Sequence, residues 1–354
     1  MGIIIMYNEN TIEENTESSA YSSETMRSSS NGNSLMLFIF LICMIGGGYL
    51  VRFILGQYLD KDSQLYDNAA FLIGMMFQYF VGVPLAIFIY KNTPSGRTTE
   101  KIGSLFCKPQ QSVWWVIKWV LISIAFTYGT SVASNMFFEL LQSLTGIELY
   151  QPDLSADDTF LSKFGNIVSI TLLAPIFEEI LMRGALLGNT KRYGTWSAVI
   201  STGIFFGLLH ANYPQIPFAA VMGVFSAFMV LKTKSIIPSL IVHFTINTIG
   251  GVMSLFTGNI DLEEMQNGNI DVIMENLGTY IIIMCAGFLV LGLIGTGLIL
   301  FILEIVMHKE SFRIDPVCPE VSEKKKLAVY FTAPVTILLT VVLLALTVVN
   351  ALPV

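Results

Sequence analysis

Two neighbouring carboxylates lie within one apolar stretch of the sequence, SITLLAPIFEEILMRGALLG. These are Glu178 and Glu179, and Arg183 follows four residues after the second. An α-helix has 3.6 residues per turn, so Glu179 and Arg183 share a face and can form an ion pair, whereas Glu178 is rotated by about 100°. A carboxylate with no partner on its own helix is suited to act as a general base or acid.

Two histidine motifs follow in later apolar stretches, FGLLH (Phe206 to His210) and HFTIN (His243 to Asn247). Imidazole can serve as a base, a metal ligand or a hydrogen-bond donor at physiological pH. The asparagine amide can orient a histidine or donate to a developing negative charge. An ionisable side chain inside a membrane helix is costly and marks a candidate functional site.

The composition indicates that the elements positioning these residues are membrane helices. The 354 residues are 53% hydrophobic and 13% charged, compared with about 25% charged in soluble domains. Apolar runs approach the roughly 20 residues that a helix needs to span a bilayer, and they lack the alternation of a membrane barrel. We therefore predict an all-α, polytopic transmembrane bundle of about eight or nine spans.

The predicted spans lie near residues 35–55, 69–90, 113–140, 166–187, 197–213, 215–231, 236–257, 278–304 and 329–351. The fifth and sixth are short and are separated only by the YPQIP turn, so they could form a helical hairpin that does not fully cross. Spans four to seven carry all three polar motifs and form the predicted catalytic core.

The chain divides into four predicted regions by composition. Residues 1–34 are rich in Ser, Asn, Thr and Glu, and we expect a disordered cytoplasmic tail because such a segment buries little apolar surface. N-terminal transmembrane helices are expected over 35–145 and the core over 160–255. A C-terminal loop and further transmembrane helices are expected over 256–354.

The distribution of basic residues predicts the orientation. With a cytoplasmic N-terminus, most of the 19 lysines and arginines fall in inside segments, and the outside loops hold only Lys61 and Lys163. We expect a multi-pass protein of the plasma membrane. No segment offers a basic face with interleaved aromatics, so nucleic-acid binding is not expected.

The three motifs, in this order and on separate spans, resemble the pattern EExxxR, FxxxH and HxxxN of the CPBP family. That family groups type II CAAX prenyl endopeptidases with Abi-like, bacteriocin-immunity-related membrane proteins. The resemblance covers roughly residues 160–255 and implies an all-helical intramembrane metalloprotease.

The resemblance also implies roles for the site residues. Glu178 would activate the attacking water and His210 would assist it. His243 and Asn247 would stabilise the oxyanion, while Glu179, Arg183 and Phe206 would orient the site. The chain has no HExxH zinc motif. Glu178, His210 and His243 could still bind one Zn²⁺ with an open position, so metal dependence is an open hypothesis.

The function expected from this resemblance is hydrolysis of peptide bonds in a membrane-associated protein or peptide, in peptide maturation or bacteriocin self-immunity. Two alternatives remain open. One is a non-catalytic membrane scaffold or immunity protein whose polar cluster only holds helices together. The other is a proton-coupled transporter that uses the same groups as a relay, although no inverted repeat is visible.

Overall fold

The computed structural model describes residues 23–93, 96, 101–150, 160–257, 274 and 276–352, and every regular element in these segments is helical. The α-helices are α2 (Ser23–Leu55), α3 (Gln64–Phe77), α4 (Val83–Lys91), α5 (Val113–Thr145), α6 (Phe160–Val168), α7 (Ala174–Glu179), α8 (Gly188–Thr190), α9 (Thr195–Leu208), α10 (Gln215–Thr233), α11 (Ile237–Thr257), α14 (Leu277–Met307), α15 (Glu323–Phe331) and α16 (Pro334–Ala351). Three π-helical segments, η1 (Gln78–Gly82), η4 (Ser169–Leu173) and η5 (Ile180–Leu187), and two 3₁₀ segments, η3 (Ile102–Leu105) and η6 (Lys309–Phe312), complete the set.

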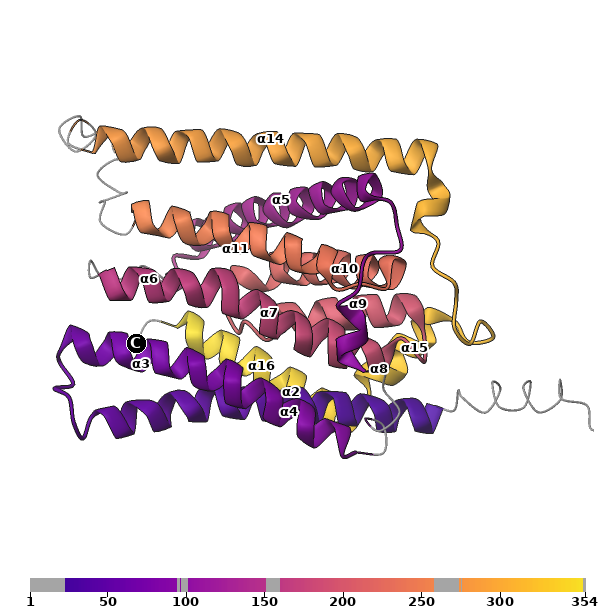
Figure 1. Ribbon diagram of the computed structural model, residues 1–354, viewed down its shortest axis with the longest axis horizontal. Helices are drawn as coiled ribbons and strands as arrows, with labels where there is room; N and C mark the ends of the chain where they lie inside the picture. The colour runs from indigo at the N-terminus through magenta and orange to yellow at the C-terminus, as the bar shows by residue number, and fades with distance from the viewer. Residues whose placement is uncertain are drawn as a thin grey trace, which may run out of the picture.

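The long helices lie roughly parallel to one another (Figure 1). Helices α7, α9, α10 and α11 occupy the middle, with α2, α3, α4 and α16 on one side and α5 and α14 on the other. Among the described residues, seven helical stretches are long and apolar enough to cross a membrane, and two shorter apolar helices accompany them. The predicted polytopic helical bundle is confirmed.

Helices α9 and α10 form a hairpin, but only α9 is short, because α10 has 19 residues and is among the stretches long enough to cross a membrane. Helix α9 has 14 residues, which corresponds to about 21 Å and is shorter than a full span. The two helices approach closely at paired glycines, because a Cβ added at Gly223 would lie 2.8 Å from the Cα of Gly203. Small residues at such a crossing allow tight helix packing in lipid.

Two of the π-helical segments lie immediately before prolines. Segment η4 precedes Pro175 and segment η1 precedes Pro84. Proline has no N–H to donate and its ring crowds the preceding turn, so a locally widened helix relieves the clash. Tyr79 therefore lies on widened helix, and the motif glutamates on α7 lie between two widened segments, which are frequent at functional sites.

The expected disorder of residues 1–34 is wrong for the described part of that segment, because α2 begins at Ser23. Four polar side chains of this part are buried: Ser29, Ser30, Asn33 and Ser34. The amide of Asn33 donates to the Thr190 hydroxyl at 3.0 Å, and the hydroxyls of Ser34 and Thr336 are 2.8 Å apart. Side chains of α8 and α16 thus form the hydrogen bonds that water would otherwise provide to Asn33 and Ser34. Residues 1–22 lie outside the described residues.

A buried ion pair connects α14 to α5. The ammonium of Lys118 lies 2.5 Å from a carboxylate oxygen of Glu304, and both side chains are largely shielded from solvent. The rest of α14 is mostly exposed, as expected for a helix that faces lipid. This pair is a second charged contact within the apolar bundle, separate from the motif residues.

Candidate active site

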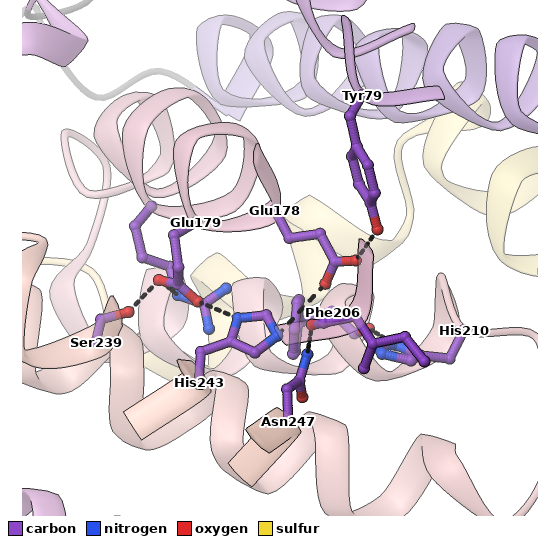
Figure 2. Close-up of polar contacts among 10 residues, drawn as sticks. Tyr79, Glu178, Glu179, Phe206, His210, Ser239, His243 and Asn247 are labelled. Carbon is purple, nitrogen blue, oxygen red and sulfur yellow. Dashed lines mark hydrogen bonds and ion pairs between the residues drawn. The ribbon is translucent and has the colours of Figure 1, made fainter. Parts of the chain in front are cut away.

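Glu178 bridges two parts of the bundle that are distant in sequence. The hydroxyl of Tyr79, on η1, donates to one of its carboxylate oxygens at 3.0 Å. The other oxygen lies 3.7 Å from Nε2 of His243, on α11. Figure 2 shows the carboxylate between these two side chains. Glu178 is thus held from both sides and keeps partial exposure, with 19% of its side chain accessible.

Glu179 points into a fully buried cluster. One of its oxygens lies 3.2 Å from Nε of Arg183 and also accepts a hydrogen bond from the hydroxyl of Ser239. The other oxygen lies 3.2 Å from Nδ1 of His243. Neither Glu179 nor Arg183 has any exposed side-chain surface. The glutamates therefore face different surroundings, as the helical rotation of the EE pair predicted.

The contacts of His243 imply where its protons lie. A carboxylate can only accept, so Nδ1 donates its proton to Glu179. In the neutral ring, Nε2 would then direct a lone pair at the Glu178 carboxylate. A proton on either Nε2 or Glu178 would make this contact attractive. The Glu178–His243 contact is therefore a place where a proton could pass between the two side chains.

Phe206 lies at the centre of the motif residues. The guanidinium carbon of Arg183 is 4.6 Å from its ring centroid, a cation–π contact. The rings of His210 and His243 meet it edge-on, with centroids 5.2 Å and 5.5 Å away. One aromatic ring thus fixes the positions of all three cationic or imidazole side chains.

His210 is oriented by its own helix end. Its Nδ1 lies 2.8 Å from the Phe206 carbonyl, and because a carbonyl only accepts, Nδ1 carries the proton and Nε2 can act as an acceptor. His210 and Glu178 line one cavity of about 160 Å³. The remaining lining residues are Phe40, Met44, Gln78, Leu181, Met182, Phe206 and Leu209. This volume is ample for water.

Asn247 has a different environment from the other motif residues. Its amide nitrogen donates to the Ile170 carbonyl at 2.9 Å, which joins α11 to η4. It lines a separate cavity of about 270 Å³ together with Tyr128 and Thr127. The widened turn of η4 leaves backbone carbonyls without their usual helical donors, which explains why an amide side chain is useful there.

The structure therefore brings six of the seven sequence-predicted site residues together and directs the seventh, Asn247, toward η4. Two polar partners, Tyr79 and Ser239, were missed. Ser239 lies four residues before His243, on the same helix face, so its spacing could have indicated it. Tyr79 is 99 residues from Glu178 in sequence, and no pattern links the two.

The residues expected to bind Zn²⁺ do not form a ligand set. Within the described segments, no three His, Cys, Asp or Glu side chains are grouped so that they could hold a metal ion. Nδ1 of His243 and Nδ1 of His210 are committed to Glu179 and to a carbonyl, which leaves Nε2 of each ring as the nitrogen that could face a metal. As placed, the three residues are not grouped as a three-ligand zinc centre, and we derive no step through one.

An all-helical bundle with two adjacent glutamates and two histidines gathered around one phenylalanine ring defines a class of intramembrane site. Residues 160–249 match the family model described as type II CAAX prenyl endopeptidase Rce1-like. This segment holds all three motifs, and its similarity to that family agrees with the resemblance of the motifs to the CPBP pattern.

A curated relative supports the same assignment. The chain is similar to the Bacillus subtilis (strain 168) protein named "Putative membrane peptidase YdiL", with 28% identity over 90 residues. That alignment covers 25% of this chain and 37% of the relative, so the chain spans little more than a third of that protein's length. No solved structure matches the chain significantly.

Proposed function

We propose that this protein is an intramembrane endopeptidase that hydrolyses a peptide bond in a membrane-associated protein or peptide. The observation that carries the proposal is the placement of Glu178. Its carboxylate lines a cavity shared with His210 and is held by Tyr79 and His243. The similarity of residues 160–249 to CAAX prenyl endopeptidases supports the same reaction class.

The mechanism begins with a water molecule in the cavity between Glu178 and His210. Glu178 accepts a proton from this water as its oxygen attacks the peptide carbonyl carbon, with His210 as the second acceptor that orients it. When the C–N bond breaks, the same proton passes from Glu178 to the leaving amine. The products are a carboxylic acid and an amine, and the carboxylate of Glu178 is regenerated.

Charge develops on the carbonyl oxygen in the transition state, and a donor must meet it. His243 with a proton on Nε2 is the group best placed to donate, because its Nδ1 is anchored to Glu179. Asn247 uses one N–H on Ile170 and acts in our proposal through the position of η4. The Glu179–Arg183 pair and Phe206 are positioning residues.

The substrate class follows from where the cavity lies. Most of its lining residues are apolar side chains of α2, η5 and α9, so a peptide would enter with little of its backbone hydrated. This favours a membrane-associated peptide, and both peptide maturation and bacteriocin self-immunity use such substrates. We place the protein in the plasma membrane with its N-terminus in the cytoplasm, as the distribution of basic residues predicts.

The test uses Glu178→Gln with Glu139→Gln as a matched control, because Glu139 lies on the exposed face of α5. Membranes from cells that express wild type or either variant are analysed by mass spectrometry of new peptide termini. We expect wild type and Glu139→Gln to share a set of termini that falls at least a hundredfold in Glu178→Gln, the scale of a lost general base. Equal termini in Glu178→Gln would exclude the mechanism and favour a scaffold.

A further inference from the structure

A second polar cavity, of about 330 Å³, lies on the side of η5 away from the Glu178 cavity. Three cationic side chains line it, Arg183, Lys191 and Lys234, and none of its lining residues is acidic. Ser104 and Gln110 add neutral hydrogen-bonding groups. Its volume is at the lower end of the range of small-ligand pockets.

The walls of this cationic cavity are fixed by hydrogen bonds between distant segments. The backbone N–H of Ile236 donates to the Leu105 carbonyl at 2.9 Å, and that of Gln110 donates to the Thr233 carbonyl at 2.9 Å. The chain after η3 is thereby attached to the connection between α10 and α11. These backbone hydrogen bonds hold the cavity walls in place. The two lysines in the lining come from the ends of different helices.

Arg183 has hydrogen-bonding capacity that its known partner does not use. Its side chain is fully buried, and Glu179 contacts only Nε. The two terminal nitrogens, NH1 and NH2, have no hydrogen-bond partner among the described residues. A buried guanidinium with unused donors is costly, and its planar fork matches the oxygens of a phosphate or carboxylate.

The position of the cavity matches the level of lipid headgroups. Arg183 lies seven residues before the end of the apolar stretch Lys163–Thr190, about 10 Å along the helix. Lys191 follows that end directly, and Lys234 follows the end of α10. Basic pockets between membrane helices at this level bind phosphate-bearing headgroups. Leu187 and Leu231, also in the lining, provide apolar surface for the adjoining part of a lipid.

We propose that this cavity binds a phosphate group, the class of ligand being an anionic phospholipid headgroup or free phosphate. Lys191 and Lys234 would contact the phosphate oxygens, and the charge of Arg183, which has no exposed side-chain surface, would act from the cavity wall. This inference concerns a different cavity from that of the proposed hydrolysis, and the two share only Arg183, which also pairs with Glu179.

The test measures binding to the purified full-length protein in neutral detergent. The probes are palmitoyl-oleoyl phosphatidylglycerol, the matching phosphatidylcholine and inorganic phosphate, each titrated while retained ligand is measured by native mass spectrometry. The variant is Lys191→Gln/Lys234→Gln. The control is Lys309→Gln/Lys325→Gln, which removes the same charge from exposed positions outside the cavity. Lys191→Arg/Lys234→Arg keeps the charge.

We expect wild type, the control and the arginine variant to bind phosphatidylglycerol alike, and the double glutamine variant to bind about 30-fold more weakly. Displacement of this lipid by millimolar phosphate would identify free phosphate as a competing source, whereas binding of the lipid alone would identify the headgroup. Equal binding by the glutamine variant and its control, or equal binding of the phosphatidylcholine, would overturn the proposal.

Discussion

The hydroxyl of Tyr79 donates a hydrogen bond to the carboxylate of Glu178 across a distance of 3.0 Å. Tyr79 lies on η1, between α3 and α4, whereas Glu178 lies on α7. The N-terminal helices are outside the segment 160–249 that matches the family model. A hydrogen-bond partner of the first motif glutamate is thus supplied by a part of the chain that the match does not cover.

Replacing Tyr79 by phenylalanine removes this hydrogen bond and leaves the ring in place. Hydrogen bonds to charged groups are worth about 1.5–3 kcal/mol, so we expect kcat to fall about tenfold to a hundredfold with KM little changed. Steady-state cleavage by the purified protein measures both. Tyr90→Phe is the matched control, since Tyr90 is equally buried but its hydroxyl has no hydrogen-bond partner among the described residues. Equal kcat in the two variants would contradict the role of Tyr79.

The buried ion pair of Glu179 and Arg183 predicts a non-additive effect on stability. Removing either partner leaves an uncompensated buried charge, so Glu179→Gln and Arg183→Met should each lower the free energy of unfolding by about 3–5 kcal/mol. The double variant should lose less than the sum of the two. Unfolding of the purified proteins in mixed micelles of increasing denaturing detergent gives the three values. Strictly additive losses would show that the pair is not coupled.

The absence of a three-ligand group in the described segments predicts the response to metal removal. We expect incubation with 1,10-phenanthroline to leave the rate of peptide cleavage unchanged, because none of the steps assigned to Glu178, His210 and His243 uses a metal. A zinc protease added to the same membranes verifies that the chelator is effective. Loss of cleavage that Zn²⁺ restores would show that these three residues rearrange into a metal centre.

Glu323 predicts a dependence of stability on pH. It lies on α15, outside the candidate spans, and accepts hydrogen bonds from the Ser197 N–H at 2.6 Å and from Lys326 at 2.7 Å. Burial acts to raise the pKa of Glu323, but these hydrogen bonds and the Lys326 charge outweigh it, so the pKa lies below its ordinary value. A lowered folded-state pKa stabilises the fold above the unfolded pKa of about 4.3, and this contribution is lost as pH falls through the folded pKa.

We therefore expect Glu323→Gln to unfold at a lower temperature than wild type near pH 7, with the difference shrinking as the pH falls below about 4. Thermal unfolding in detergent across this range measures it. Glu310→Gln is the control, because the Glu310 side chain is 87% exposed and forms only a long contact with Arg313. A difference that stays constant with pH would show that the Glu323 charge does not matter.

The sequence predicted contacts of the candidate site correctly where the helical spacing of two residues and their chemistry indicated the same partner. The one-turn spacing of Glu179 and Arg183 predicted their pairing, and the different direction of Glu178 followed from helical rotation. Contacts between distant helices were beyond such reasoning. The helical state of residues 23–34 depends on partners such as Thr190 and Thr336, so local composition suggested disorder. The role of Asn247 likewise depends on the widened turn at Ile170, which periodicity does not reveal.

One wall of the Glu178 cavity is formed by Phe40 and Met44 of α2 and by Gln78 of η1. In the proposed mechanism, the reacting groups and part of the surface that would touch the incoming peptide are therefore encoded in separable stretches of the gene. Under the same proposal, changes in the first two membrane helices would alter substrate preference while the glutamate–histidine chemistry stays constant. A chimera that exchanges residues 23–93 between two members should carry its preference for substrate with the transplanted helices.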